Sequence, residues 1–86
     1  MSTFEMIVKN ETLDDIVTVF ALIQATPHLD MMIRIYNREL LEEYGALEDA
    51  YARLINAGVL ANGKHGLAVK GPNWKPPAYM TERRYL

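Results

Sequence analysis

The strongest constraint on the fold is a series of three segments whose apolar residues recur at helical spacing between Thr12 and Gly58. A helix with an apolar stripe must bury it against another element, so three such helices in succession predict one shared hydrophobic core. We expect the first helix to be the most buried, because its stripe is the widest. The stripes comprise Leu13, Ile16, Val17, Val19, Phe20, Leu22 and Ile23 in the first segment, Leu29, Met32, Ile33, Tyr36, Leu40 and Tyr44 in the second, and Leu47, Ala50, Tyr51, Leu54 and Ile55 in the third.

Local signals indicate where these helices begin and end. Thr12, with an acidic residue three positions later, predicts the N-cap of the first helix. Thr26-Pro27 ends that helix and starts the second, since threonine suits a cap and proline suits a first helical position. Asn37 caps well and propagates poorly, so it can divide the second segment into two shorter helices. Gly45 breaks the chain, and Gly58 closes the third helix in the C′ position.

Extended segments are predicted on both sides of the helices. Apolar and polar residues alternate over residues 3–8, which predicts a short half-buried strand. Residues 59–61 and a run through residues 67–69 flank Asn62-Gly63, which predicts a hairpin whose two turn positions both take positive φ. A lone hairpin is marginal in water, so we expect the N-terminal strand to join it as a third strand. The predicted fold class is α+β.

Size and composition favour a binding role. At 86 residues the chain forms one domain, with little room for a deep substrate pocket. The absence of cysteine favours a reducing compartment, the N-terminus lacks the features of a signal peptide, and no apolar stretch is long enough to span a membrane. We therefore expect a cytoplasmic protein that binds through its surface and does not contact a membrane.

The residue types that catalysis and metal binding require are scarce. With no cysteine, and with Ser2 as the only serine, no internal Ser–His or Cys–His arrangement is available. His28 and Asp30 lie at a predicted helix start, where capping is the commoner role, and His65 follows the hairpin turn. Adjacent carboxylates diverge on a helix and do not converge on one substrate atom. We expect no enzymatic activity, no cofactor and no metal site.

Two segments resemble a known family. Ala50–Leu60 (AYARLINAGVL), followed by the Asn62-Gly63 hairpin, resembles the end of a winged helix-turn-helix domain, where the third helix runs directly into the wing. Glu39–Gly45 (ELLEEYG) resembles the second helix of that family and the glycine of its turn. The resemblance covers about residues 12–70. With the predicted N-terminal strand, it implies a three-helix winged-helix-like domain over residues 1–70 with a C-terminal β-hairpin, followed by a proline-rich, aromatic and basic tail over residues 71–86.

The resemblance also implies a DNA-binding function, because in that family the third helix lies in the major groove. Glu48 and Asp49 occupy early positions of this helix, where they would face the phosphates of a duplex. Basic and polar residues elsewhere are better suited to that contact. The candidate DNA-binding residues are Arg53, Asn56, Lys64, His65, Lys70, Lys75, Arg83 and Arg84.

The charge pattern favours a protein partner instead. Residues 1–50 carry ten acidic and three basic side chains, whereas residues 51–86 carry six basic and one acidic. An acidic helical half complements a basic protein, and the tail combines the tryptophan, tyrosine and arginine that dominate interface hot spots. Trp74 either meets a partner or folds back onto its own domain. The candidate protein-binding residues are Glu42, Glu43, Glu48, Asp49, Trp74, Tyr79 and Tyr85.

Two functions therefore compete. The leading hypothesis is a small non-catalytic protein-binding module of the inhibitor, immunity, antitoxin or phage-modulator type, which acts on a basic protein. The alternative is a winged-helix DNA-binding transcriptional regulator. A homo-oligomer is compatible with either function.

Overall fold

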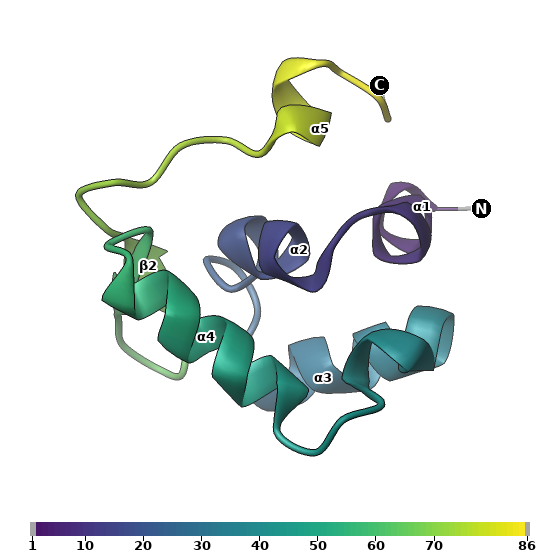
Figure 1. The fold of residues 1–86 in the computed structure, drawn as a ribbon, viewed down its shortest axis with the longest axis horizontal. Helices are drawn as coiled ribbons and strands as arrows, with labels where there is room; N and C mark the ends of the chain where they lie inside the picture. Colours follow the sequence, from purple (N-terminus) through teal and green to yellow (C-terminus); the bar gives the residue numbers. More distant parts are fainter. Residues whose placement is uncertain (1, 86) are drawn as a thin grey trace.

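The computed structural model describes residues 2–85, which fold into a small α+β domain. In Figure 1, α2 lies near the middle, with α1, α3 and α4 around it and α5 above it. The α+β class is confirmed, although the described residues form more helices than the three expected. In chain order the elements are α1 (Thr3–Asn10), α2 (Leu13–Phe20), α3 (Thr26–Asn37), the 3-10 helix η1 (Arg38–Leu41), α4 (Ala46–Asn56), β1 (Leu60–Asn62), β2 (Ala68–Lys70) and α5 (Ala78–Thr81).

The N-terminal segment is the helix α1, so the strand expected over residues 3–8 is wrong. Ser2 caps this helix, and its Oγ accepts a hydrogen bond from the Glu5 N–H at 3.1 Å. Phe4 and Ile7 are three residues apart and share one helix face, so the apolar residues fit a helical period as well as an alternating one. The capping serine is what distinguishes the helix from a strand.

The three predicted helical segments are present, with small differences at their ends. Thr12 caps α2 as expected, and its Oγ1 accepts a hydrogen bond from the Asp15 N–H at 3.2 Å. Thr26 is the first residue of α3 and Pro27 the second, so this helix begins one residue earlier than expected and has no side-chain cap. Asn37 divides the second segment as expected, because α3 ends there and η1 follows.

The core surrounds α2, which supports the prediction that this helix is the most buried. Phe20 is only partly buried, and its ring packs edge-to-face on Phe4 with centroids 4.7 Å apart. Ile23 lies beyond the end of α2 and is exposed, although its spacing placed it on the stripe. The side chains with no exposed surface are Val8, Ile16, Val17, Ala21, Leu29, Ile33 and Ala50.

The β-hairpin is confirmed, but its turn differs from the prediction. The antiparallel strands β1 and β2 are joined by five residues, Gly63–Leu67, rather than by a two-residue Asn62-Gly63 turn. The positive φ angles fall on His65 (60°) and Gly66 (78°). The Gly63 N–H donates to the carbonyl of Leu67 at 3.0 Å, so the glycine closes a longer loop.

The sheet has two strands within residues 2–85, and the N-terminal segment does not join it. Helix packing replaces the missing third strand. Leu60 and Ala68 face the core, with 1% and 7% of their surface exposed. The Ala68 N–H also donates to the carbonyl of Ala21, just after α2, at 2.9 Å. These contacts explain how a hairpin that would be marginal alone is held in place.

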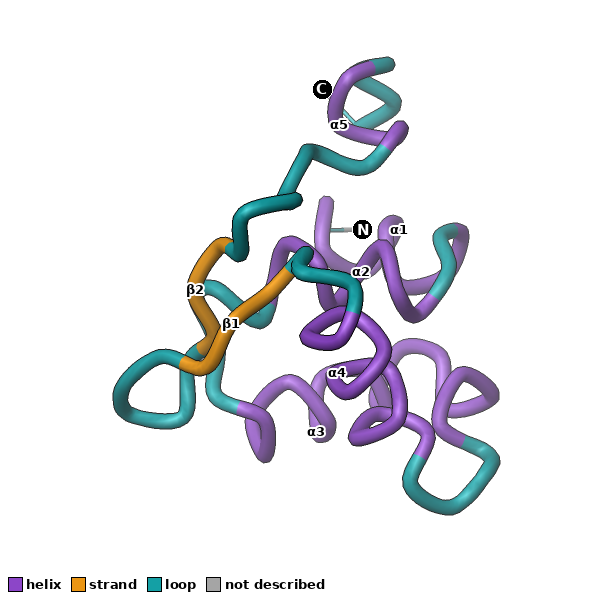
Figure 2. Tube along the Cα trace, turned by 60° about the vertical axis from the view of Figure 1, so that its left-hand side comes forward, coloured by secondary structure: helices purple, strands orange, loops and turns teal. Residues whose placement is uncertain are grey.

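The C-terminal segment leaves β2, runs back over the helices and ends beside α1 and α2 (Figure 2). The indole Nε1–H of Trp74 donates to the carbonyl of Thr18 in α2 at 2.9 Å. Pro77 is buried at the start of α5, and Tyr79 has 2% of its surface exposed. The tail over residues 71–85 is therefore packed on its own domain, and its extended part gives way to a short helix.

Candidate functional site

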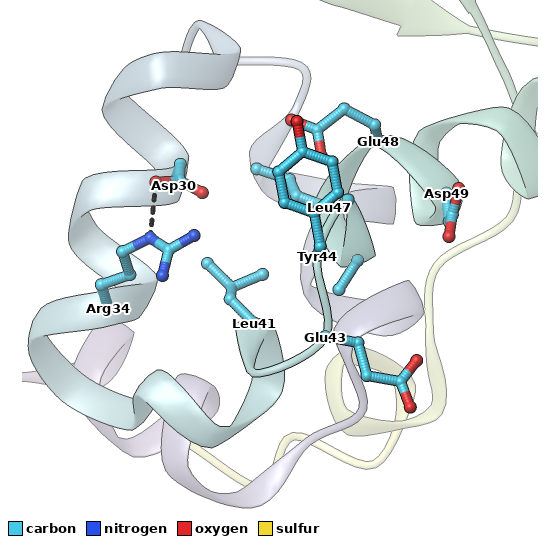
Figure 3. Close-up of a pocket in the computed structure, with 10 residues that line it drawn as sticks. Asp30, Arg34, Leu41, Glu43, Tyr44, Leu47, Glu48 and Asp49 are labelled. Atoms are coloured by element: carbon cyan, nitrogen blue, oxygen red, sulfur yellow. Dashed lines mark hydrogen bonds and ion pairs between the residues drawn. The ribbon is translucent and has the colours of Figure 1, made fainter.

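A hollow of about 400 Å³ lies between α3, η1 and the first turn of α4. Figure 3 shows Asp30 and Arg34 of α3 on one side, and Glu48 and Asp49 of α4 on the other. Four carboxylates line it against a single guanidinium, so its charge is negative. The hollow forms where the chain turns from η1 into α4.

Tyr44 stands at the edge of this hollow and is the most exposed aromatic residue of the described chain, at 104% of its reference surface. The local backbone explains the exposure. Leu41 before it and Leu47 after it are buried, and Gly45 adopts a left-handed φ of 77° that allows the sharp turn into α4. The side chain between these two anchors projects into solvent. The prediction that Tyr44 belongs to an apolar helical stripe is wrong, because the helix ends before it.

Three of the predicted protein-binding residues, Glu43, Glu48 and Asp49, line the same hollow as Tyr44, and a fourth, Glu42, lies two residues before Tyr44 in the chain. Glu42, Glu43, Glu48 and Asp49 are exposed, and none forms an ion pair with another residue in 2–85. Glu48 and Asp49 lie in the first turn of α4, where the helix dipole stabilises negative charge. We call Tyr44 with these four carboxylates the Tyr44 surface.

Among the described residues, Arg34 is the one cation that lines this hollow, and it is bound to Asp30. Its Nε donates to the Asp30 carboxylate at 2.9 Å, and this hydrogen bond raises the pKa of the guanidinium. The ion pair lies on α3 with a four-residue separation, which is a favourable spacing on a helix. Glu48 interacts with the Arg34 guanidinium only electrostatically and forms no ion pair with it in residues 2–85.

Several candidate DNA-binding residues are bound within the protein. Arg53 of α4 donates to the Asp14 carboxylate from Nε at 3.2 Å and from Nη2 at 2.6 Å, and the hydrogen bond raises its pKa. Lys70 places its Nζ 4.2 Å from the centre of the Trp74 ring, in a cation–π contact. These cations interact with other parts of the same chain.

Arg84 is held in the same way. Its Nε donates to Glu82 at 3.0 Å and its Nη1 to Glu11 at 2.9 Å, and the bond to Glu82 raises its pKa. The remaining candidates are exposed but lie on separate elements, and the structure does not gather them on one element. They are Asn56 at the end of α4, Lys64 and His65 in the hairpin loop, Lys75 in the segment after β2, and Arg83 after α5.

The three aromatic candidates of the tail contact their own domain. Trp74 is bonded to α2, as described above, and the Tyr79 ring meets the Tyr85 ring edge-to-face at 5.9 Å. The Tyr85 hydroxyl donates to the Glu11 carboxylate, and this bond raises the pKa of Tyr85. In this arrangement all three rings pack within the domain, whereas Tyr44 is fully exposed. Tyr44 directly follows two glutamates and directly precedes Gly45, and this pattern is the sequence signal that could have indicated a loop.

Known proteins offer no template for this surface, since no protein family, curated protein or solved structure matches the chain. Within residues 2–85, no three histidine, aspartate or glutamate side chains come together as metal ligands. No helix in the same range has the length and apolarity needed to cross a membrane.

Proposed function

We propose that this chain is a small non-catalytic protein-binding module that docks on a basic protein through the Tyr44 surface. The observation that carries the proposal is the fully exposed Tyr44 ring among carboxylates without ion-pair partners in residues 2–85. Tyrosine is enriched at interface hot spots because it buries a large area at a low cost in side-chain entropy. The module fits the inhibitor, immunity, antitoxin or phage-modulator type.

The charge of the surface determines the kind of partner. Carboxylates gathered around one hollow repel each other, and a lysine or arginine from a partner relieves this repulsion. Such a cation also binds over the face of an exposed tyrosine, a contact worth about 0.5–1 kcal/mol at an exposed site. Both effects favour a partner with a basic docking patch, and complementary charge accelerates its association.

Arg53 of α4 supports the same conclusion. This residue is the only cation of α4, and Asp14 already accepts its two hydrogen bonds. Glu48 and Asp49 begin the helix, so a duplex placed against α4 meets two carboxylates before it meets a cation. Phosphates at about one charge per 1.7 Å of duplex axis are repelled by such a face.

A DNA-binding regulator is the second candidate, favoured by one observation. Helix α4 runs through Gly58 directly into the β1–β2 hairpin, and Lys64 and His65 are exposed in the hairpin loop. A hairpin with basic residues in this place can act as a wing on the backbone of a duplex.

The test compares the parent chain with Tyr44→Ala, using Ile35→Ala as a matched control. Ile35 is also exposed, at 66%, but it does not line the hollow. We expect the immobilised parent and control to retain the same basic protein from a lysate of the source cells, and Tyr44→Ala to lose it. Titration with mixed-sequence duplex runs in parallel. Equal retention by all three forms contradicts the proposal, and micromolar or tighter duplex binding at physiological salt supports the regulator.

A further inference from the structure

A second hollow, of about 220 Å³, lies between the hairpin loop, the first residue of α3 and the later part of α4, and we call it the hairpin hollow. The loop projects at one edge of the molecule, beyond the ends of β1 and β2 (Figure 2). Ile55 and Leu67 give the hollow two half-buried apolar walls, and every side chain that lines it is uncharged. The lining includes Thr26, Tyr51, Ile55, Gly63, Leu67 and Ala68.

The size of the hairpin hollow suits one side chain of a docked protein. Its volume lies below the range of about 300–1,000 Å³ that is typical of small-molecule sites. Gly63 and Gly66 are exposed where they line it, so neither of these loop residues has a side chain that could close the mouth. A planar ring that enters between apolar walls buries a large area, so an aromatic side chain is the best occupant.

Positive charge borders the hairpin hollow. Lys64 and His65 are exposed, and they lie in the loop between Gly63 and Gly66, which both line the hollow. Lys64 forms no ion pair within residues 2–85. The sequence from Ala50 to Thr81 contains no aspartate or glutamate, so the hairpin and its flanking segments add no negative charge. A surface that carries carboxylates around an aromatic ring is therefore complementary to this edge of the domain.

The Tyr44 surface of the same chain has that composition. The Tyr44 ring is fully exposed, and the carboxylates of this surface have no ion-pair partners in residues 2–85. Tyr44 lines the hollow between α3 and α4 and does not line the hairpin hollow, so the two features stay apart within one copy. A second copy of the chain can bring them together.

We propose that the Tyr44 surface of one copy docks on the hairpin hollow of a second copy, so that the chain associates head to tail. The Tyr44 ring enters between the apolar walls, and Glu48 and Asp49 face Lys64. Because the contact joins two different patches, each added copy presents a free patch of its own, and the assembly grows with concentration. This inference rests on the proposed function, since it uses the same Tyr44 surface, and self-association then competes with the basic partner.

The test is sedimentation velocity of the full chain over a series of concentrations. We expect the mass of the parent to rise beyond that of a dimer. It should fall again when salt is raised from about 0.15 M to about 1 M, because the Debye length shrinks from about 8 Å to about 3 Å. Tyr44→Ala and Lys64→Glu should each weaken the association at least about tenfold. Ile35→Ala and Lys75→Glu are the matched controls, because both residues are exposed and line neither hollow.

A mixture of the two weakened variants tests the pairing of the patches. Tyr44→Ala keeps the hairpin hollow and its lysine, whereas Lys64→Glu keeps the Tyr44 surface. An equimolar mixture should therefore form a one-to-one heterodimer that does not grow further, although each variant alone is a monomer. Circular dichroism spectra and melting temperatures that match those of the parent establish that both variants are folded.

A parent that sediments as a monomer up to its solubility limit overturns the proposal. So does association that Tyr44→Ala or Lys64→Glu leaves unchanged, or a mixture that stays monomeric. The Lys64→Glu chain also separates this inference from the proposed function, because it should still retain the basic protein in the pull-down. Retention without self-association of the parent contradicts only the head-to-tail contact, and self-association without retention contradicts only the basic partner.

Discussion

Arg53 of α4 donates two hydrogen bonds to the carboxylate of Asp14 in α2, from Nη2 at 2.6 Å and from Nε at 3.2 Å. The contact joins two helices that are 39 residues apart in the sequence at these positions. It also neutralises the one cation of α4 by an ion pair within the chain. Sequence alone could count these charges but could not show that they neutralise each other.

Replacing Asp14 with asparagine should therefore release the Arg53 guanidinium. We expect duplex affinity to rise and the slope of log K against log salt to steepen by up to about 0.9, the value for one added phosphate contact. Stability should change little, because both side chains of this ion pair are substantially exposed, at 57% and 41%. Fluorescence titration of mixed-sequence duplex at two salt concentrations measures the effect. The control is Glu5→Gln, which frees Lys9 on α1. If both variants gain the same duplex affinity, the role given to Arg53 is wrong.

A comparison of two glycines tests the hairpin loop. Gly63 lies in that loop, and Gly45 lies before α4. A Cβ on Gly63 would lie 2.6 Å from the carbonyl oxygen of Leu67, so Gly63→Ala must displace backbone. Gly45 has a φ of 77° and open space around its Cβ position, so Gly45→Ala meets only left-handed strain of about 1–2 kcal/mol. Urea unfolding should show a larger loss of unfolding free energy for Gly63→Ala than for Gly45→Ala. The opposite order contradicts the five-residue loop.

The core gives a prediction about α2. Ile16 has no exposed surface, so Ile16→Ala should lower the free energy of unfolding by about 2–5 kcal/mol. Phe20 is only partly buried and packs at the edge of the core on Phe4, so Phe20→Ala should cost less than removal of a fully buried phenylalanine. Thermal and urea unfolding of both variants measure this. If Ile16→Ala leaves the protein stable and Phe20→Ala destabilises it severely, the assignment of the core around Ile16 is wrong.

The helical part of this fold follows from its sequence because the stripes of α2, α3 and α4 repeat over two or three turns. The secondary structure of the short segments is less fully determined by their local sequence. The apolar residues of α1 fit both a helix and a strand, and only the Ser2 cap separates the two. The Asn62-Gly63 pair carries a strong turn signal, yet His65 and Gly66 take the positive φ angles, and the Ala68 N–H is held by the carbonyl of Ala21, a tertiary contact that the local sequence does not encode.

The candidate site was only partly predictable for a related reason. The carboxylates of the Tyr44 surface could be named from their charge, because acidic residues at a helix start stay in solvent. Tyr44 itself continued the apolar spacing of α3, and its exposure depends on where η1 ends and on the left-handed Gly45. The tail rings matched the composition of an interface, but Trp74 and Tyr79 fill contacts to α2 and the core that only tertiary structure reveals.

Two tyrosines of the C-terminal segment predict sensitivity to alkaline pH. Burial raises the pKa of Tyr79, and the hydrogen bond to Glu11 raises that of Tyr85. Both groups then hold their protons more tightly in the folded chain than in the unfolded chain. Stability should be fully present below the ordinary tyrosine pKa of about 10 and should fall as pH rises above it. Unfolding free energies measured between pH 8 and pH 11 test this window, and Tyr79→Phe should flatten the decline.

The last prediction separates the two functions by reversing charge on the Tyr44 surface. Glu48 and Asp49 are exposed and unpaired within residues 2–85, so replacing both with lysine should leave the fold intact apart from a small loss at the helix N-terminus. A basic protein partner should then associate more slowly and bind more weakly. Duplex DNA should bind more tightly, because two repulsive charges become two phosphate contacts.

The converse variant, Arg53→Ala with Lys64→Ala, removes cations outside the Tyr44 surface. It should leave the protein complex largely unchanged and should weaken any duplex binding. The experiment measures binding of the parent and of both double variants. Each protein is titrated with the captured partner and with mixed-sequence duplex, at two salt concentrations. Glu39→Lys serves as the charge control, because Glu39 is exposed on η1 and does not line the Tyr44 hollow. If the parent binds duplex tightly and the Arg53→Ala, Lys64→Ala variant does not, the protein-binding hypothesis is contradicted and the DNA-binding regulator is supported.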